Sequence, residues 1–89
     1  MNREKLTELI IQILVQIQDI SGREVPPDMG SRTKPIGGLQ GFDSLNGLEL
    51  TMMLPDEIEW EERNLCVSND GKRALNIGEI VDRLLSVEN

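Results

Sequence analysis

The chain has 89 residues and carries 9 Lys and Arg against 16 Asp and Glu, which predicts one small acidic domain with a formal net charge of −7. A chain this negative repels phosphate backbones and anionic lipid head groups, and it has no basic patch to offset the repulsion, so we expect neither nucleic acid nor a membrane surface as a partner. The sequence has no His, no Tyr and a single cysteine, Cys66, which excludes a His-dependent triad, a His or cysteine zinc site and an internal disulfide.

Residues 3–20 have the clearest helical pattern. Their apolar side chains recur at spacings of three and four, as on one face of an amphipathic helix: Leu6, Leu9, Ile10, Ile13, Leu14, Ile17 and Ile20. Asn2 is a suitable N-cap, and Ser21-Gly22 is a suitable stop. Because the apolar stripe is wide, we expect neighbours on more than one side of this helix, as in a small helical bundle.

Residues 21–42 are predicted to form a long loop, because Gly and Pro recur throughout them. Loops of this length inside compact domains are uncommon and are usually either functional or partly disordered. Ile36, Leu39 and Phe42 are its apolar anchors. We therefore expect the second half of the loop to lie against the bundle.

A second helix is predicted over residues 44–58, with Asp43 or Ser44 as its cap. Its apolar positions form two lines, of which one can face the core and the other can face outward. One line consists of Gly47, Leu50, Leu54 and Ile58, and the other of Leu45, Leu48 and Met52. For Met52, the alternative to an outward-facing position is that of an ordinary core methionine. Pro55 removes a backbone N–H and crowds the carbonyl of Thr51, which predicts a kink or an end near residue 55.

The excess negative charge lies in and after this helix. Residues 35–62 contain no Lys or Arg, whereas acids and bases are equal in number in the rest of the chain. The acids of the segment are Asp43, Glu49, Asp56, Glu57, Glu59, Glu61 and Glu62. The segment is a candidate recognition surface for a basic partner, and a solvated helix face is the alternative.

Residues 61–74 are predicted to be irregular or to form a short element, and residues 76–87 to form the last helix. Asp70-Gly71 marks a tight turn, in either a short hairpin or a single helical turn. Asn76 and Glu79 have the spacing of a capping box. The buried stripe of the last helix is predicted to consist of Ile77, Ile80, Val81, Leu84 and Leu85.

Most candidate chemical sites fail on residue type or spacing. A calcium loop around Gly71 would place Cys66 and Ile77 where carboxylates are required. Cys66 has apolar neighbours and no histidine to activate it, so we interpret it as a small buried hydrophobe. Adjacent acids such as Asp56 and Glu57 point in different directions on a helix, which is unsuitable for a pair of glycosidase carboxylates.

One candidate chemical site remains, the segment Gly41-Phe42-Asp43-Ser44-Leu45-Asn46-Gly47-Leu48-Glu49-Leu50. A serine at the start of a helix presents its hydroxyl beside N–H groups that have no partner in the helix. A phosphate attached there would be favoured by the helix dipole. An ordinary N-cap serine is the alternative.

This segment resembles the phosphopantetheine attachment motif of acyl carrier proteins, in which Asp-Ser-Leu opens the second helix and Glu follows five residues after the serine. Asp43-Ser44-Leu45 and Glu49-Leu50 match that motif, and residues 75–81 resemble the entry to the family's last helix. The length, the acidity and the order of the expected elements agree as well. The resemblance implies an all-α fold: a right-handed, acyl-carrier-protein-like four-helix bundle with a long loop between helices 1 and 2.

The resemblance also implies a carrier that is not itself an enzyme and binds no metal. Ser44 would receive 4'-phosphopantetheine from coenzyme A through a magnesium-dependent phosphopantetheinyl transferase, and the arm would carry acyl, aminoacyl or polyketide intermediates as thioesters to loading, transfer or synthase enzymes. Asp43 would orient the serine loop and contact the transferase. Glu49, Asp56 and Glu57 would attract basic partners around an apolar centre of Leu45, Leu48 and Met52. Such a carrier is expected to be a cytoplasmic monomer.

Several residues depart from the family's common pattern. Gln40 and Gly41 lengthen the approach to the serine, Gly47 removes a side chain from the second helix, and Pro55 interrupts its acidic end. Lys72 and Arg73 lie in an unusually long stretch before the last helix. These changes favour a specialised carrier in a dedicated biosynthetic pathway over the housekeeping fatty-acid carrier. The alternative function is an unmodified bundle that acts as a structural or regulatory adaptor through its acidic helix.

Overall fold

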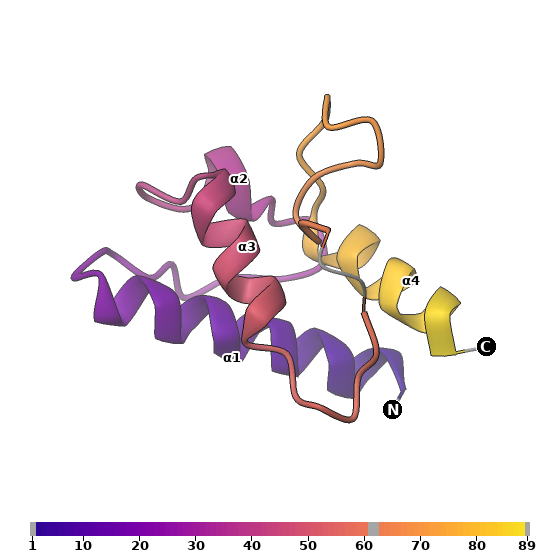
Figure 1. The fold of residues 1–89 in the computed structure, drawn as a ribbon. Coiled ribbons are helices and arrows are strands. Elements are labelled where there is room, and N and C mark those ends of the chain that lie inside the picture. Colours follow the sequence, from indigo (N-terminus) through magenta and orange to yellow (C-terminus); the bar gives the residue numbers. More distant parts are fainter. Residues whose placement is uncertain (1, 61–62, 89) are drawn as a thin grey trace.

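The computed structural model describes residues 2–60 and 63–88, and this part of the chain is all-α. Its helices are α1 (Arg3–Ile20), α2 (Pro35–Gly38), α3 (Ser44–Met52) and α4 (Ile77–Glu88). Figure 1 shows α1 as the long base of the molecule, with α3 crossing it and α4 beside it; α1 packs against both, and α2 packs against α3. No helix in the described ranges combines the length and the apolar character needed to cross a bilayer.

Helix α1 has the bounds that its apolar periodicity predicts. The Asn2 side chain accepts a hydrogen bond from the backbone N–H of Lys5 at 2.9 Å, as expected of an N-cap, and Gly22 ends the helix with a φ of 68°. Ile20 was expected in the buried stripe, but its side chain is 77% exposed. It is the last residue of α1, where the chain turns away from the core, and Gln18 is buried in the preceding turn instead.

The loop after α1 is anchored as its apolar residues predict, since Leu39 and Phe42 are buried and Ile36 packs against the core. It also contains α2, a four-residue turn that the sequence analysis missed because Gly and Pro dominate it. The carbonyls of Thr33 and Ser31 accept hydrogen bonds from Ile77 and Gly78 at 2.8 Å each. The loop therefore satisfies two N–H groups at the start of α4 that no helical carbonyl can reach.

The expected helix over 44–58 is wrong at its end, because α3 stops at Met52. Pro55 has no N–H to donate, and its ring would crowd the carbonyl of Thr51, so the helix ends before the proline instead of continuing with a kink. The chain then turns irregularly, with a hydrogen bond of 3.0 Å from Ile58 N–H to the Pro55 carbonyl. Ile58 is buried although it is no longer helical.

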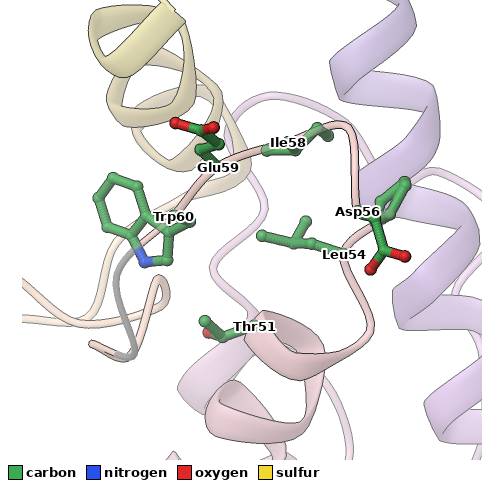
Figure 2. Close-up of a pocket in the computed structure, with 7 residues that line it drawn as sticks. Thr51, Leu54, Asp56, Ile58, Glu59 and Trp60 are labelled. Carbon is green, nitrogen blue, oxygen red and sulfur yellow. The ribbon is translucent and has the colours of Figure 1, made fainter.

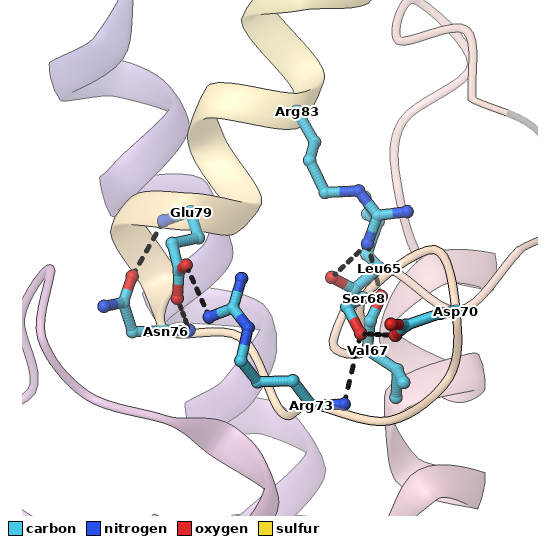
Figure 3. Close-up of polar contacts among 8 residues, drawn as sticks. All are labelled: Leu65, Val67, Ser68, Asp70, Arg73, Asn76, Glu79 and Arg83. Atoms are coloured by element: carbon cyan, nitrogen blue, oxygen red, sulfur yellow. Dashed lines mark hydrogen bonds and ion pairs between the residues drawn. The ribbon is translucent and has the colours of Figure 1, made fainter.

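Residues 63–76 form a loop with a short hairpin, which decides between the two alternatives for Asp70-Gly71. Val67 and Ala74 make an isolated antiparallel bridge, and Gly71 turns with a φ of 73°. Figure 3 shows how polar side chains hold this loop to α4. Arg73 pairs with Glu79 at 2.8 Å, and Asn76 and Glu79 form the expected capping box, with hydrogen bonds of 2.8 and 3.0 Å.

Candidate functional site

The site that the sequence singled out lies at the start of α3, where Asp43 is the cap and Ser44 is the first helical residue. The Asp43 carboxylate accepts a hydrogen bond from Asn46 N–H at 3.1 Å, and the Asn46 side-chain oxygen accepts one from Asp43 N–H at 3.2 Å. The Ser44 side chain is exposed, and its hydroxyl makes no hydrogen bond within the part of the chain that the structure describes. The alternative of an N-cap serine is therefore wrong, because Asp43 performs that role.

Asn46 joins this cap to the end of α1, a role that the sequence analysis missed. Its side-chain oxygen also accepts a hydrogen bond from Arg23 Nη1 at 2.9 Å, and its amide nitrogen donates to Glu49 at 3.3 Å. The Asp43–Asn46 spacing of three is a capping-box signal that could have indicated the local pair. Arg23 is twenty-three residues away in sequence, so no local pattern could have indicated it.

The two residues that lengthen the approach to Ser44 have a structural role. Gln40 is held on both sides, since its carbonyl accepts a hydrogen bond from the buried Gln18 at 2.7 Å and its side chain accepts one from Glu24 N–H at 2.7 Å. Gly41 has a φ of 66° and lies against Arg23, whose Nε would be 2.9 Å from a Cβ at this position. Both the backbone conformation and the space favour glycine here.

A second support reaches the same helical turn from the loop after α3. The Asn64 amide nitrogen donates to the Ser44 carbonyl at 2.8 Å, and the Asn64 side-chain oxygen accepts from Cys66 N–H at 2.9 Å. Gly47 lies directly beneath this amide. Gly47, which departs from the motif that the sequence resembles, is thus the residue against which Asn64 packs.

The two apolar lines of α3 separate as predicted. Gly47 and Leu50 are buried, whereas Leu45, Leu48 and Met52 are 72%, 39% and 84% exposed. We call these last three residues the exposed apolar face. The core interpretation of Met52 is wrong, since its side chain lies in solvent beyond the core.

The acids expected to recognise partners do not all lie on α3. Asp43 and Glu49 are exposed on the helix and its cap, but Asp56 and Glu57 are exposed on the irregular segment that follows it. That segment surrounds a pocket of about 570 Å³, lined by Thr51, Leu54, Pro55, Asp56, Ile58, Glu59 and Trp60 (Figure 2). Glu61 and Glu62 lie outside the described residues.

Cys66 has the environment that its apolar neighbours predict. Its side chain is fully buried, and this burial raises the pKa of the thiol to about 12, although the positive charge of Arg83 opposes the rise. A thiol with this pKa is almost entirely protonated near neutral pH, so it is a poor nucleophile. Among the described residues, no three or more His, Cys, Asp or Glu side chains gather in a way that could hold a metal ion.

Comparison with known proteins finds no match to this chain among protein-family models, curated proteins or solved structures.

Proposed function

We propose that this chain is a carrier protein whose Ser44 receives a 4'-phosphopantetheine arm. The observation that carries the proposal is the division of roles at the start of α3. Asp43 and Asn46 cap the helix by themselves, which leaves the Ser44 hydroxyl exposed and without a hydrogen bond among the described residues. A hydroxyl in this position is accessible to a modifying enzyme and has no structural contact to lose on modification.

The electrostatics of the helix start favour a phosphodiester at Ser44. The capping box uses the N–H of Asn46, and that of Gly47 bonds to the Asp43 carbonyl at 3.1 Å. The N–H groups of Ser44 and Leu45 precede the first position that can bond within the helix. Their partial positive charge, together with the helix dipole, stabilises a nearby anion by about 0.3–1 kcal/mol at an exposed site.

The surface beside Ser44 suits transient docking of several enzymes. The exposed apolar face begins at Leu45, next to the proposed attachment point, and Glu49 is exposed on the same helix. Apolar contacts at the centre of an interface supply most of the binding energy, while surrounding charges steer the encounter. A transferase and the enzymes that load, transfer or extend the cargo are therefore expected to present a basic surface with an apolar centre.

In this proposal the chain performs no chemistry itself. The arm's thiol holds the cargo as a thioester, and Ser44 serves only as its attachment point. The unusual residues around the site, Gln40, Gly41 and Gly47, each have a defined contact in the structure, which supports a specialised member of the family with its own partners. Action as a monomer in the cytoplasm belongs to the same proposal.

The test is the intact mass of the purified protein after co-expression with a promiscuous phosphopantetheinyl transferase. The proposal predicts a gain of one phosphopantetheine, which is lost in Ser44→Ala. Ser86→Ala is the matched control, because Ser86 is also an exposed helical serine. The Ser86→Ala variant is expected to gain one phosphopantetheine at Ser44, as the parent protein does. A folded parent protein that stays unmodified with several transferases would contradict the proposal and favour the adaptor function.

A further inference from the structure

Asn64 forms a bridge between two segments of backbone that are far apart in the sequence. Its amide nitrogen donates to the Ser44 carbonyl at 2.8 Å, and its side-chain oxygen accepts from Cys66 N–H at 2.9 Å. The side chain thus uses both ends of its amide between the first residue of α3 and the loop that leads to the hairpin. Hydrogen bonds of this kind fix the distance between the two segments.

The space that Asn64 occupies exists because residue 47 has no side chain. A Cβ at Gly47 would lie 2.4 Å from the Asn64 side-chain oxygen and 2.9 Å from its amide nitrogen, both closer than van der Waals contact allows. The φ of Gly47 is not positive, so its backbone conformation does not require glycine. Glycine weakens a helix interior relative to alanine, and at this position it provides room for Asn64.

The backbone of Asn64 is fixed to the core in turn. Arg83 of α4 donates to the carbonyls of Asn64, Leu65 and Val67 at 3.4, 3.2 and 2.6 Å, and two of these contacts are drawn in Figure 3. Its guanidinium also lies 5.0 Å from the centre of the Trp60 ring. The contact at Ser44 is therefore connected through Arg83 to α4, which packs against α1.

We propose that Asn64 is a positioning residue for the modification of Ser44, and that Gly47 is its matched partner. Asn64 holds the Ser44 carbonyl and so fixes the orientation of the first turn of α3, from which the Ser44 hydroxyl projects toward the transferase. Correct placement of a reacting group lowers the barrier only while its orientation is maintained. This inference rests on the proposed function of Ser44, because it names a residue that supports that reaction.

Steady-state modification by a transferase, with coenzyme A in excess and the carrier varied, tests the role of Asn64. Asn64→Asp keeps the acceptor for Cys66 N–H but loses the donor to the Ser44 carbonyl, and Asn64→Ala loses both. We expect kcat to fall about tenfold in both variants, the scale set by one lost hydrogen bond. KM for the carrier should not change, since the exposed apolar face and Glu49 are untouched.

Thr51→Val is the matched control for a purely structural effect. The Thr51 hydroxyl donates to the Gly47 carbonyl at 2.9 Å and accepts from Leu65 N–H at 3.1 Å, so it joins the same loop to the same helix, but two turns beyond Ser44. This variant is expected to lower the free energy of unfolding as Asn64→Ala does while keeping the parent kcat. Equal losses of kcat in Thr51→Val and Asn64→Ala would overturn the inference.

A second experiment tests the matched pair without any transferase. Gly47→Ala is expected to lower the urea midpoint in the parent protein, because the new Cβ displaces Asn64, but to raise it in an Asn64→Gly background, where alanine only improves the helix. The same sign in both backgrounds would overturn the pairing of Gly47 with Asn64.

The experiments distinguish a wrong role for Asn64 from a wrong function for Ser44. A parent protein that no transferase modifies contradicts both proposals, whereas a parent protein that is modified at the same kcat as Asn64→Asp contradicts the positioning role alone. Loss of kcat in Asn64→Ala but not in Asn64→Asp would also contradict it, because the bond to Cys66 would then be the important one.

Discussion

At the residue scale, Asp43 and Ser44 could each cap the start of α3, and Asp43 does so. The sequence places both at the start of a helix, and a side-chain oxygen on either could accept a first-turn N–H. Asp43 becomes the cap because Asn46 completes a reciprocal pair with it. The start of α3 at this pair could be predicted from the sequence, whereas attachment at Ser44 stays a prediction. The supports behind the helix start, Arg23 and Asn64, could not be predicted, because they come from segments that are distant along the chain.

Cys66 provides a residue-scale prediction on alkaline stability. Burial raises the pKa of its thiol from 9.0 to about 12, so the folded protein keeps a proton that the unfolded chain releases. The stabilising contribution of the neutral thiol is present below pH 9.0 and is lost as the pH rises toward about 12. Urea unfolding as a function of pH should show a fall in this range that is shallower in Cys66→Ala. An equally steep fall in that variant would contradict the assignment.

At the element scale, α3 shows what periodicity can and cannot predict. The spacing of its apolar residues correctly separated a buried line, with Gly47 and Leu50, from the exposed apolar face. The same spacing continues through Leu54 and Ile58, although the helix stops at Met52. Beyond the helix, Ile58 is buried and Leu54 is partly buried against the core, although neither residue is helical. The end of the helix depends on Pro55 and on what the following segment packs against.

The exposed apolar face makes a separate prediction about partners. Leu45→Gln and Met52→Gln should each change the free energy of unfolding by no more than about 0.5 kcal/mol, because neither side chain lies in the core. Both should nevertheless raise KM for the carrier in the transferase reaction. Leu50→Ala, on the buried face of the same helix, is the control and should cost about 2–5 kcal/mol of stability. An unchanged KM in both Gln variants would exclude this face from the docking surface.

The junction between the hairpin loop and α4 is expected to be sensitive to acid. Hydrogen bonds from Asn76 N–H and from Arg73 lower the pKa of Glu79 below its ordinary 4.5. Because this pKa is lower in the folded state, the stabilising contribution is present above pH 4.5 and is lost as the pH falls through the folded value. Glu79→Gln should therefore flatten the loss of stability in mild acid. Circular dichroism during acid titration measures this loss. The same profile in Glu79→Gln as in the parent protein would contradict this role of Glu79.

At the scale of the whole molecule, local patterns predict the main helices but not how the connections join them. α1 and α4 follow from their apolar stripes and caps. The hydrogen bonds from the start of α4 to the carbonyls of Ser31 and Thr33 form only when the chain is folded. The same is true of the contact between Asn64 and α3. The uneven charge was also visible in advance, because residues 35–62 contain acids and no bases.

This charge distribution predicts that association with partners depends on salt. Exposed charges are screened over about 10 Å at 0.1 M ionic strength, so the association rate with a basic transferase should fall as salt is added. Stopped-flow measurement with Glu49→Gln should show a weaker dependence, while the dissociation rate changes less. A rate that is insensitive to salt would assign recognition to the exposed apolar face alone.

Attachment of a phosphopantetheine arm to Ser44 can be measured by the intact mass of this protein purified from its own cells, followed by fragmentation of the peptide that contains Ser44. We expect a mass above that of the sequence by one phosphopantetheine, with any further cargo released by hydroxylamine, and all of the added mass on Ser44. The bare sequence mass in cells that contain a transferase able to modify other carriers would contradict it.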